Sequence, residues 1–199
     1  MKGELVLSGV PVWDSISYVF MAYASFEMAH HIMRAGGTSG SSDSTETRTA
    51  RSVEYCRRVP TGQDPPKHWQ SLVLSATLMT LLDIVTDPLA VRGDQWFLGK
   101  IFYYEHPGIY FGVPFSNFAG WFFVGLIIFS LFAAVEKKLP LTASPLRISA
   151  LGPLFYLSIM LFNLAITFWI RQWSLGLSSS LIFLGVILLG RKSFGRRMQ

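Results

Sequence analysis

Five long apolar blocks constrain the fold of this chain more than any other feature of its sequence. A helix needs about 20 residues to cross a hydrocarbon core of about 30 Å, and the blocks reach that length. They are continuously apolar, whereas the strands of a membrane barrel alternate and are about half as long. The sequence therefore predicts an all-α fold, a polytopic integral membrane helical bundle of about five transmembrane helices. Residues 1–199 form a single membrane domain, and the predicted spans are 11–33, 69–91, 110–135, 147–170 and 173–190.

Composition supports the membrane class and excludes a nucleic-acid partner. Only 15% of the residues are charged, against nearer a quarter in soluble domains. The formal net charge is +5, but the basic residues flank the apolar blocks and are not interleaved with stacking aromatic residues. The excess of positive charge therefore indicates membrane topology.

Lysine and arginine are distributed very unevenly between the two sides of the predicted bundle. One side carries Arg34, Arg48, Arg51, Arg57, Arg58, Lys67, Lys137, Lys138, Arg147, Arg191, Lys192, Arg196 and Arg197. The other side carries Lys2, Arg92, Lys100 and Arg171. Because loops rich in basic residues stay in the cytoplasm, we predict a multi-pass cell-membrane protein with its N-terminus outside and its C-terminus cytoplasmic.

Two connecting segments differ in character. Residues 35–67 are rich in Gly, Ser and Thr and predict a flexible cytoplasmic loop, which also holds the sole cysteine, Cys56. The segment between the second and third spans is aromatic instead, and indicates either a cover over the mouth of the bundle or an aromatic belt at the interface. Its aromatic residues are Trp96, Phe97, Phe102, Tyr103, Tyr104, Tyr110, Phe111 and Phe115.

Two acidic residues lie inside the second predicted span. Each ionisable side chain within a membrane helix costs roughly 2.5–3.5 kcal/mol on insertion scales, so Asp83 and Asp87 require an explanation. Their spacing of four places both carboxyls on one face, which we expect to point into the bundle. Burial and mutual repulsion favour one carboxyl keeping its proton as a general acid while the other remains a base. The alternative is a structural pair bonded to Arg92 or to neighbouring helices.

Asn117 opens the third predicted span, on the same outer side as the two aspartates. Asp14 and the Glu105-His106 pair fall on that side as well, so these residues together predict a site. The alternative for Asn117 is an ordinary N-cap, because Asn or Ser before an apolar run satisfies the first free amides of a helix.

Glu27-Met28-Ala29-His30 on the first span has the Glu-x-x-His spacing of di-iron bundles. Such sites need a second copy of the motif, and the sequence has none. Glu27 also lies too deep along its helix to share a metal ion with the aspartates. No phosphate loop, zinc spacing or nucleophile elbow occurs either, so we predict neither a metal nor a cofactor.

Three stretches, LLDIVTDPLAVRGDQW, YFGVPFSNFAGWF and GVPVWDSISYVFMAYAS, resemble a membrane-embedded carotenoid-biosynthesis family. This family includes the bisanhydrobacterioruberin and γ-carotene 1′-hydratases. The resemblance implies a lyase-type hydratase that adds water to the terminal double bond of an acyclic carotenoid, a lipid-soluble polyene that enters from the bilayer.

On this interpretation, one of Asp83 and Asp87 protonates the alkene, and the other, with Asn117, orients and deprotonates water. The rings of Trp96, Tyr110 and Trp121 stabilise the carbocation. Asp14 and Arg92 complete the predicted substrate-binding set.

Other functions stay open from the residues alone. The Asp83/Asp87 pair suits a small membrane transporter or proton relay. The same Asp-x-x-x-Asp spacing occurs in Mg²⁺-diphosphate motifs of membrane prenyltransferases, for which Asp14, Arg92 and Lys100 are the available partners. A non-catalytic assembly protein is a fourth alternative. Neither the oligomeric state nor the carotenoid follows from the sequence.

Overall fold

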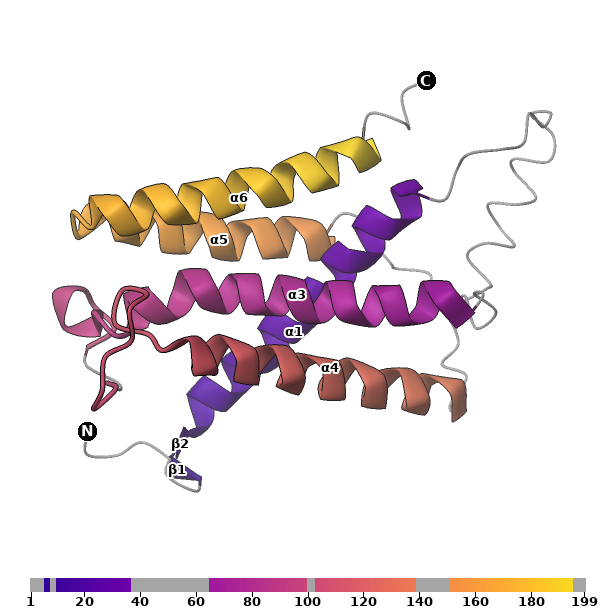
Figure 1. The fold of residues 1–199 in the computed structure, drawn as a ribbon, viewed down its shortest axis with the longest axis horizontal. Coiled ribbons are helices and arrows are strands. Elements are labelled where there is room, and N and C mark those ends of the chain that lie inside the picture. The colour runs from indigo at the N-terminus through magenta and orange to yellow at the C-terminus, as the bar shows by residue number, and fades with distance from the viewer. Residues whose placement is uncertain (1–5, 8–9, 37–64, 100–102, 139–150, 195–199) are drawn as a thin grey trace.

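The computed structural model describes residues 6–7, 10–36, 65–99, 103–138 and 151–194 of the chain. Within these residues the helices are α1 (Val12–Gly36), α3 (Pro65–Ala90), α4 (Phe115–Lys138), α5 (Leu151–Trp169) and α6 (Trp173–Phe194) (Figure 1). The two-residue strands β1 (Val6–Leu7) and β2 (Val10–Pro11) pair ahead of α1, and the short 3-10 helix η1 (Gly93–Gln95) follows α3. The prediction of an all-α bundle is confirmed.

Four of the described helices are long and apolar enough to cross a membrane, so the chain is a multi-pass membrane protein. The spans are Trp69–Ala90, Phe115–Val135, Leu151–Trp169 and Trp173–Arg191. Helix α1 has 25 residues but does not join this group, and its sequence includes Glu27, His30 and His31. That α1 also crosses the bilayer, and that the N-terminus lies outside, stay predictions.

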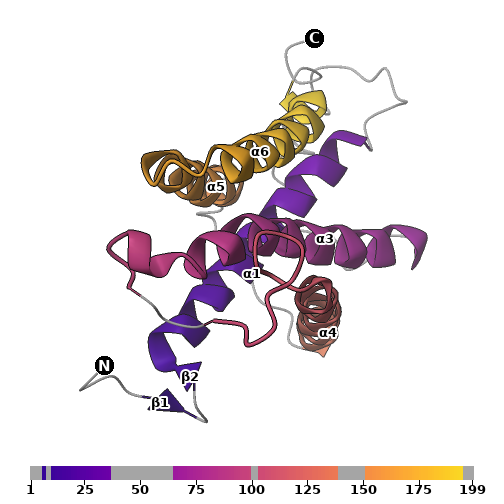
Figure 2. The same cartoon turned by 60° about the vertical axis from the view of Figure 1, so that its left-hand side comes forward.

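Helices α1 and α3 form the centre of the bundle. Helix α3 lies between α4 on one side and the α5–α6 pair on the other, and α1 crosses it obliquely (Figure 1). The turned view in Figure 2 shows the same oblique crossing. Helix α3 contacts all four of the other helices, and α1 also contacts α5 and α6. The end of α3, the start of α4 and the α5–α6 turn therefore lie at the same end of the molecule (Figure 1).

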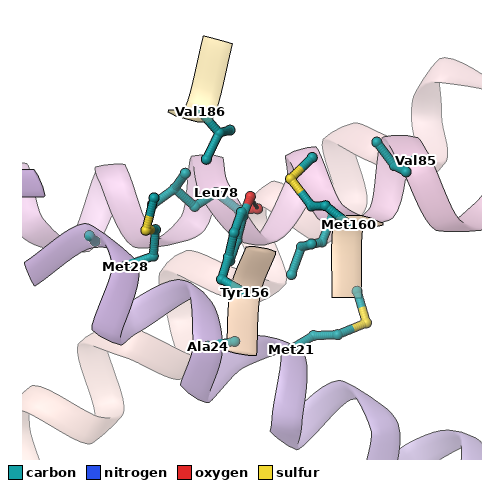
Figure 3. Close-up of a cluster of buried hydrophobic side chains, with 10 residues drawn as sticks. Met21, Ala24, Met28, Leu78, Val85, Tyr156, Met160 and Val186 are labelled. Carbon is teal, nitrogen blue, oxygen red and sulfur yellow. Dashed lines mark hydrogen bonds between the residues drawn. The ribbon is translucent and has the colours of Figure 1, made fainter. Parts of the chain in front are cut away.

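The main core joins α1, α3, α5 and α6 around Tyr156 (Figure 3). The Tyr156 side chain is 0% exposed, and its hydroxyl donates a 2.8 Å hydrogen bond to the carbonyl of Leu78. The other members of this cluster are Met21, Ala24, Met28, Ala29, Leu82, Val85, Met160 and Val186. Lipid tails are as apolar as these side chains, so close packing and the internal hydrogen bond stabilise the contact more than hydrophobic burial does.

A second cluster joins α4 to α1 and α3, with small residues at the closest approach. It consists of Ala22, Ala76, Met79 and Phe129. A Cβ added at Gly125 of α4 would lie 3.3 Å from the Cα of Ala76 in α3, which is tighter than ordinary contact. Small residues of this kind let two membrane helices approach backbone to backbone.

The chain turns sharply at two predicted boundaries. Helix α4 begins at Phe115, five residues after the predicted start, because residues 108–113 form a small turn with paired Gly108 and Gly112. Gly112 has a φ of 93°, which glycine adopts without strain. At the turn between α5 and α6, Arg171 has a φ of 58°. Residues 37–64, which hold Cys56 and most of the predicted flexible loop, lie outside the described residues.

Candidate active site at the end of α3

The two acidic residues of α3 lie one turn apart on a buried face of the helix. Asp83 is 2% exposed and Asp87 is 6% exposed. Pro88 follows directly inside the helix. Since proline has no N–H, the helix lacks one hydrogen bond beside the acidic pair. As the sequence predicts, both carboxyls point into the bundle.

Asn117 of α4 joins the two carboxyl groups. Its Nδ2 atom donates to Oδ2 of Asp87 at 2.6 Å and to Oδ2 of Asp83 at 3.1 Å. Asn117 is the third residue of α4, so it lies inside the helix and not at the N-cap position that the alternative required. One amide from a neighbouring helix therefore holds two acidic side chains together.

The carboxyl groups of Asp83 and Asp87 are close enough to accept hydrogen bonds from the same side-chain nitrogen of Asn117. Two like charges this close in a water-poor site cannot both ionise at low cost. The arrangement is that of an acid and a base side by side.

Tyr104 is a further member of the site, which the sequence did not single out from its aromatic neighbours. Its hydroxyl donates to Oδ2 of Asp87 at 3.3 Å. Burial, and then the nearby charge of Asp87, raise the pKa of Tyr104 above its ordinary value. Tyr104 therefore remains a neutral hydrogen-bond donor throughout the physiological pH range.

One carboxyl oxygen of the pair has no hydrogen-bond partner among the residues that the structure describes. Oδ1 of Asp83 is buried and unpartnered, while the donors from Asn117 go to the Oδ2 atoms. Burying an unsatisfied acceptor costs about 1–3 kcal/mol, and such groups are few in native proteins. An atom that bears this cost is a candidate for direct contact with a substrate.

Arg92 fastens the segment that follows α3 and does not neutralise the aspartates. Its Nη1 atom donates to the carbonyl of Pro88 at 2.7 Å and to that of Phe111 at 2.8 Å. Its guanidinium also lies 6.0 Å from the centre of the Phe111 ring. Partial burial lowers the pKa of Arg92 from its usual value. The structural alternative is therefore present in its second form, because the carboxyls bond to Asn117 of a neighbouring helix while Arg92 donates to backbone carbonyls.

The three predicted aromatic residues lie on separate elements near this end. Trp96 donates from Nε1 to the carbonyl of Leu89 at 3.2 Å, and Trp121 stacks on Tyr18 of α1 with ring centres 4.1 Å apart. Tyr110 packs edge-on against Phe118, and its hydroxyl is buried without a partner. Trp121 lies one turn beyond Asn117 on α4, so it shares that face of the helix.

The remaining predicted residues are Asp14, Glu105 and His106. Asp14 lies in α1, and its side chain is outside the described part of the structure. Glu105 and His106 are both exposed.

The Glu-x-x-His motif of α1 lies apart from this site. Glu27 packs against Gly152 of α5, where an added Cβ would lie 2.2 Å from the Cβ of Glu27. His30 donates from Nδ1 to the carbonyl of Phe26 at 2.9 Å. Among the described residues, no three His, Cys, Asp or Glu side chains are grouped to hold a metal ion.

Comparison with known proteins identifies relatives at the level of the family. The family model described as "Carotenoid biosynthesis protein" matches residues 2–188, nearly the whole chain. No curated protein and no solved structure matches the chain. The match includes all the residues of the Asp83, Asp87, Asn117 and Tyr104 cluster.

Proposed function

Since the chain belongs to the carotenoid biosynthesis protein family, we propose that it is a hydratase for acyclic carotenoid end groups. The enzyme would add water to the terminal carbon–carbon double bond and leave a tertiary alcohol. The observation that carries this proposal is the buried pair Asp83 and Asp87, held together by one amide of Asn117. A protonated acid beside an ionised one is what alkene hydration requires.

The proposed reaction has two proton transfers and no redox step. The protonated aspartate donates its proton to the less substituted alkene carbon, and the π electrons form the new C–H bond. Water then adds to the tertiary carbocation. The ionised aspartate takes the proton that this water loses, and transfer of that proton to its neighbour restores the starting state, so the sum is one water molecule added to the alkene.

The surroundings of the pair support this chemistry. A water-poor site keeps one carboxyl neutral and strengthens the interaction of the other with a cationic intermediate. The electron-rich faces of Trp96, Tyr110 and Trp121 serve as the cation-stabilising surface in this proposal. Arg92 would act by holding residues 103–111 near the end of α3. The substrate is a lipid-soluble polyene, which reaches a site between membrane helices laterally from the bilayer.

The family match favours carotenoid chemistry over a transporter or proton relay. It also favours it over a prenyltransferase, because a Mg²⁺-diphosphate site needs basic partners that face the phosphates. Here the Nη1 atom of Arg92 donates to two backbone carbonyls.

The test is expression of the chain in cells that accumulate a lycopene-type polyene, followed by chromatography of the pigments. We expect a hydroxylated product from the wild type and its loss in Asp83→Asn and Asp87→Asn. Asp94→Asn is the matched control, because Asp94 is an exposed acid at the same end of the bundle and should leave product formation unchanged. A wild-type chain without hydroxylated product, or full activity in both aspartate variants, would refute the proposal.

A further inference from the structure

The hydrogen-bond donors around the acidic pair are not shared equally. Oδ2 of Asp87 accepts from Asn117 at 2.6 Å and from Tyr104 at 3.3 Å. Asp83 accepts the longer of the two Asn117 bonds, at 3.1 Å, and its Oδ1 atom has no partner. Donors to a carboxyl oxygen stabilise the ionised form, so the negative charge belongs on Asp87.

The two carboxyls also differ in depth. Asp87 is one turn, about 6 Å, nearer the end of α3 than Asp83. It is also the one that contacts the segment after η1, through Tyr104. On the proposed function, water would arrive from the end of the helix, and the polyene would lie among the apolar side chains deeper in the bundle.

We propose that the two aspartates have fixed and different roles, with Asp83 as the proton donor to the alkene and Asp87 as the base for water. Tyr104 is the positioning residue that maintains this difference, because its hydroxyl adds a second donor to Asp87 alone. This assignment rests on the hydratase function proposed above and specifies how that site works. In this assignment the unpartnered Oδ1 of Asp83 is the oxygen that would deliver the proton to the alkene carbon.

Infrared spectroscopy of the purified protein tests the assignment independently of any activity. A protonated carboxyl has a C=O band that moves in D₂O, and comparison of variants shows which residue carries it. We expect this band to disappear in Asp83→Asn, because the remaining Asp87 is ionised. We expect it to remain in Asp87→Asn, because the remaining Asp83 keeps its proton.

The other outcomes overturn the assignment. Loss of the band only in Asp87→Asn would reverse the two roles, and loss in both variants would mean one proton shared equally. A band that persists in both variants would mean that the proton is not confined to Asp83. If the spectra fit the proposal but no hydroxylated carotenoid forms, the proton assignment stands and the hydratase function fails.

Tyr104→Phe tests the positioning role. Removing one hydrogen bond to an ionised group should lower kcat roughly 10-fold to 100-fold with KM within about twofold. It should also weaken the C=O band of protonated Asp83, because the proton moves to Asp87 in a fraction of the molecules. Tyr103→Phe is the matched control at a neighbouring, 65% exposed tyrosine and should change neither quantity. Unchanged kcat and an unchanged band in Tyr104→Phe would refute the role of Tyr104.

Discussion

The middle and the end of α3 handle buried polar groups in opposite ways. In the middle, the Tyr156 hydroxyl meets the carbonyl of Leu78 and is otherwise surrounded by apolar side chains. At the end, Asp83 and Asp87 bond to side chains from other segments, and one carboxyl oxygen is left unpartnered. Two carboxyl groups one turn apart inside a membrane helix are more costly to bury than a single hydroxyl, and this cost favours a functional role for the end of α3.

Removing the Asn117 amide, which bonds to both acids, should have the largest effect on activity. We expect Asn117→Leu to lower product formation roughly 100-fold or more. Its amide makes two bonds to the acidic pair, and bonds to charged groups contribute about 1.5–3 kcal/mol each. Asn163→Leu is the matched control, because the amide of Asn163 is also buried but donates to the carbonyl of Ile159 in its own helix. Pigment chromatography measures product formation in both variants. Equal losses of product would mean that Asn117 matters no more for activity than a buried structural amide.

Truncation of Tyr156 should instead lower stability more than activity. Tyr156→Ala should lower the free energy of unfolding by about 3–5 kcal/mol, because it empties a fully buried position. Tyr156→Phe loses only the bond to Leu78 and should cost about 1 kcal/mol. Thermal unfolding in detergent measures both changes. A loss of activity in correctly folded Tyr156→Phe that matches that of Asn117→Leu would contradict this separation.

The turn before α4 provides a third test. A Cβ at Gly108 would lie 2.2 Å from the carbonyl oxygen of Val113, so Gly108→Ala forces the turn to move. We expect a cost of about 1–3 kcal/mol in stability, together with lower activity, because this turn precedes Asn117 and follows Tyr104. Gly120→Ala is the control, since a Cβ there meets nothing within 4 Å and alanine favours a helix. Equal effects of the two substitutions on activity would argue against a role for the turn.

The smallest effect is expected at the aromatic pair between α1 and α4. Tyr18→Leu removes the stacking on Trp121 and should cost about 0.5–1.5 kcal/mol in stability. Unfolding in detergent measures it, with Tyr23→Leu as control at an exposed position of the same helix. A larger loss in the control would show that the stacked pair does not stabilise the α1–α4 contact.

The sequence predicts much of the bundle and the centre of the site. Continuous apolar blocks correspond to the four membrane-length helices, and the cost of burying charge pointed directly to Asp83 and Asp87. Depth along the helices also grouped Asn117 with them, which the hydrogen bonds now show. The catalytic roles of these residues remain predictions.

Other features depend on contacts that no local pattern encodes. Tyr104 is one of several aromatic residues in a segment without helical or strand periodicity, so nothing in the sequence indicates which one reaches Asp87. Residues 110–114 were predicted to be helical because most of them are apolar, but the positive φ of Phe111 and Gly112 turns the chain there. The oblique path of α1, which brings Tyr18 onto Trp121, is set by packing with three other helices.

The close approach at Gly125 and Ala76 has a consequence for the chemistry two helical turns away. Gly125 and Asn117 are eight residues apart on α4, and Ala76 and Asp83 are seven apart on α3, so both contacts lie along one seam. Neither helix has a large side chain at Gly125 and Ala76, so this contact sets the distance between α3 and α4 along the seam. A bulkier residue at 125 would wedge the helices apart and lengthen the 2.6 Å bond from Asn117 to Asp87. The absence of a side chain at Gly125 thus sets the distance between the Asn117 amide and the Asp87 carboxyl, although Gly125 lies two helical turns away from them.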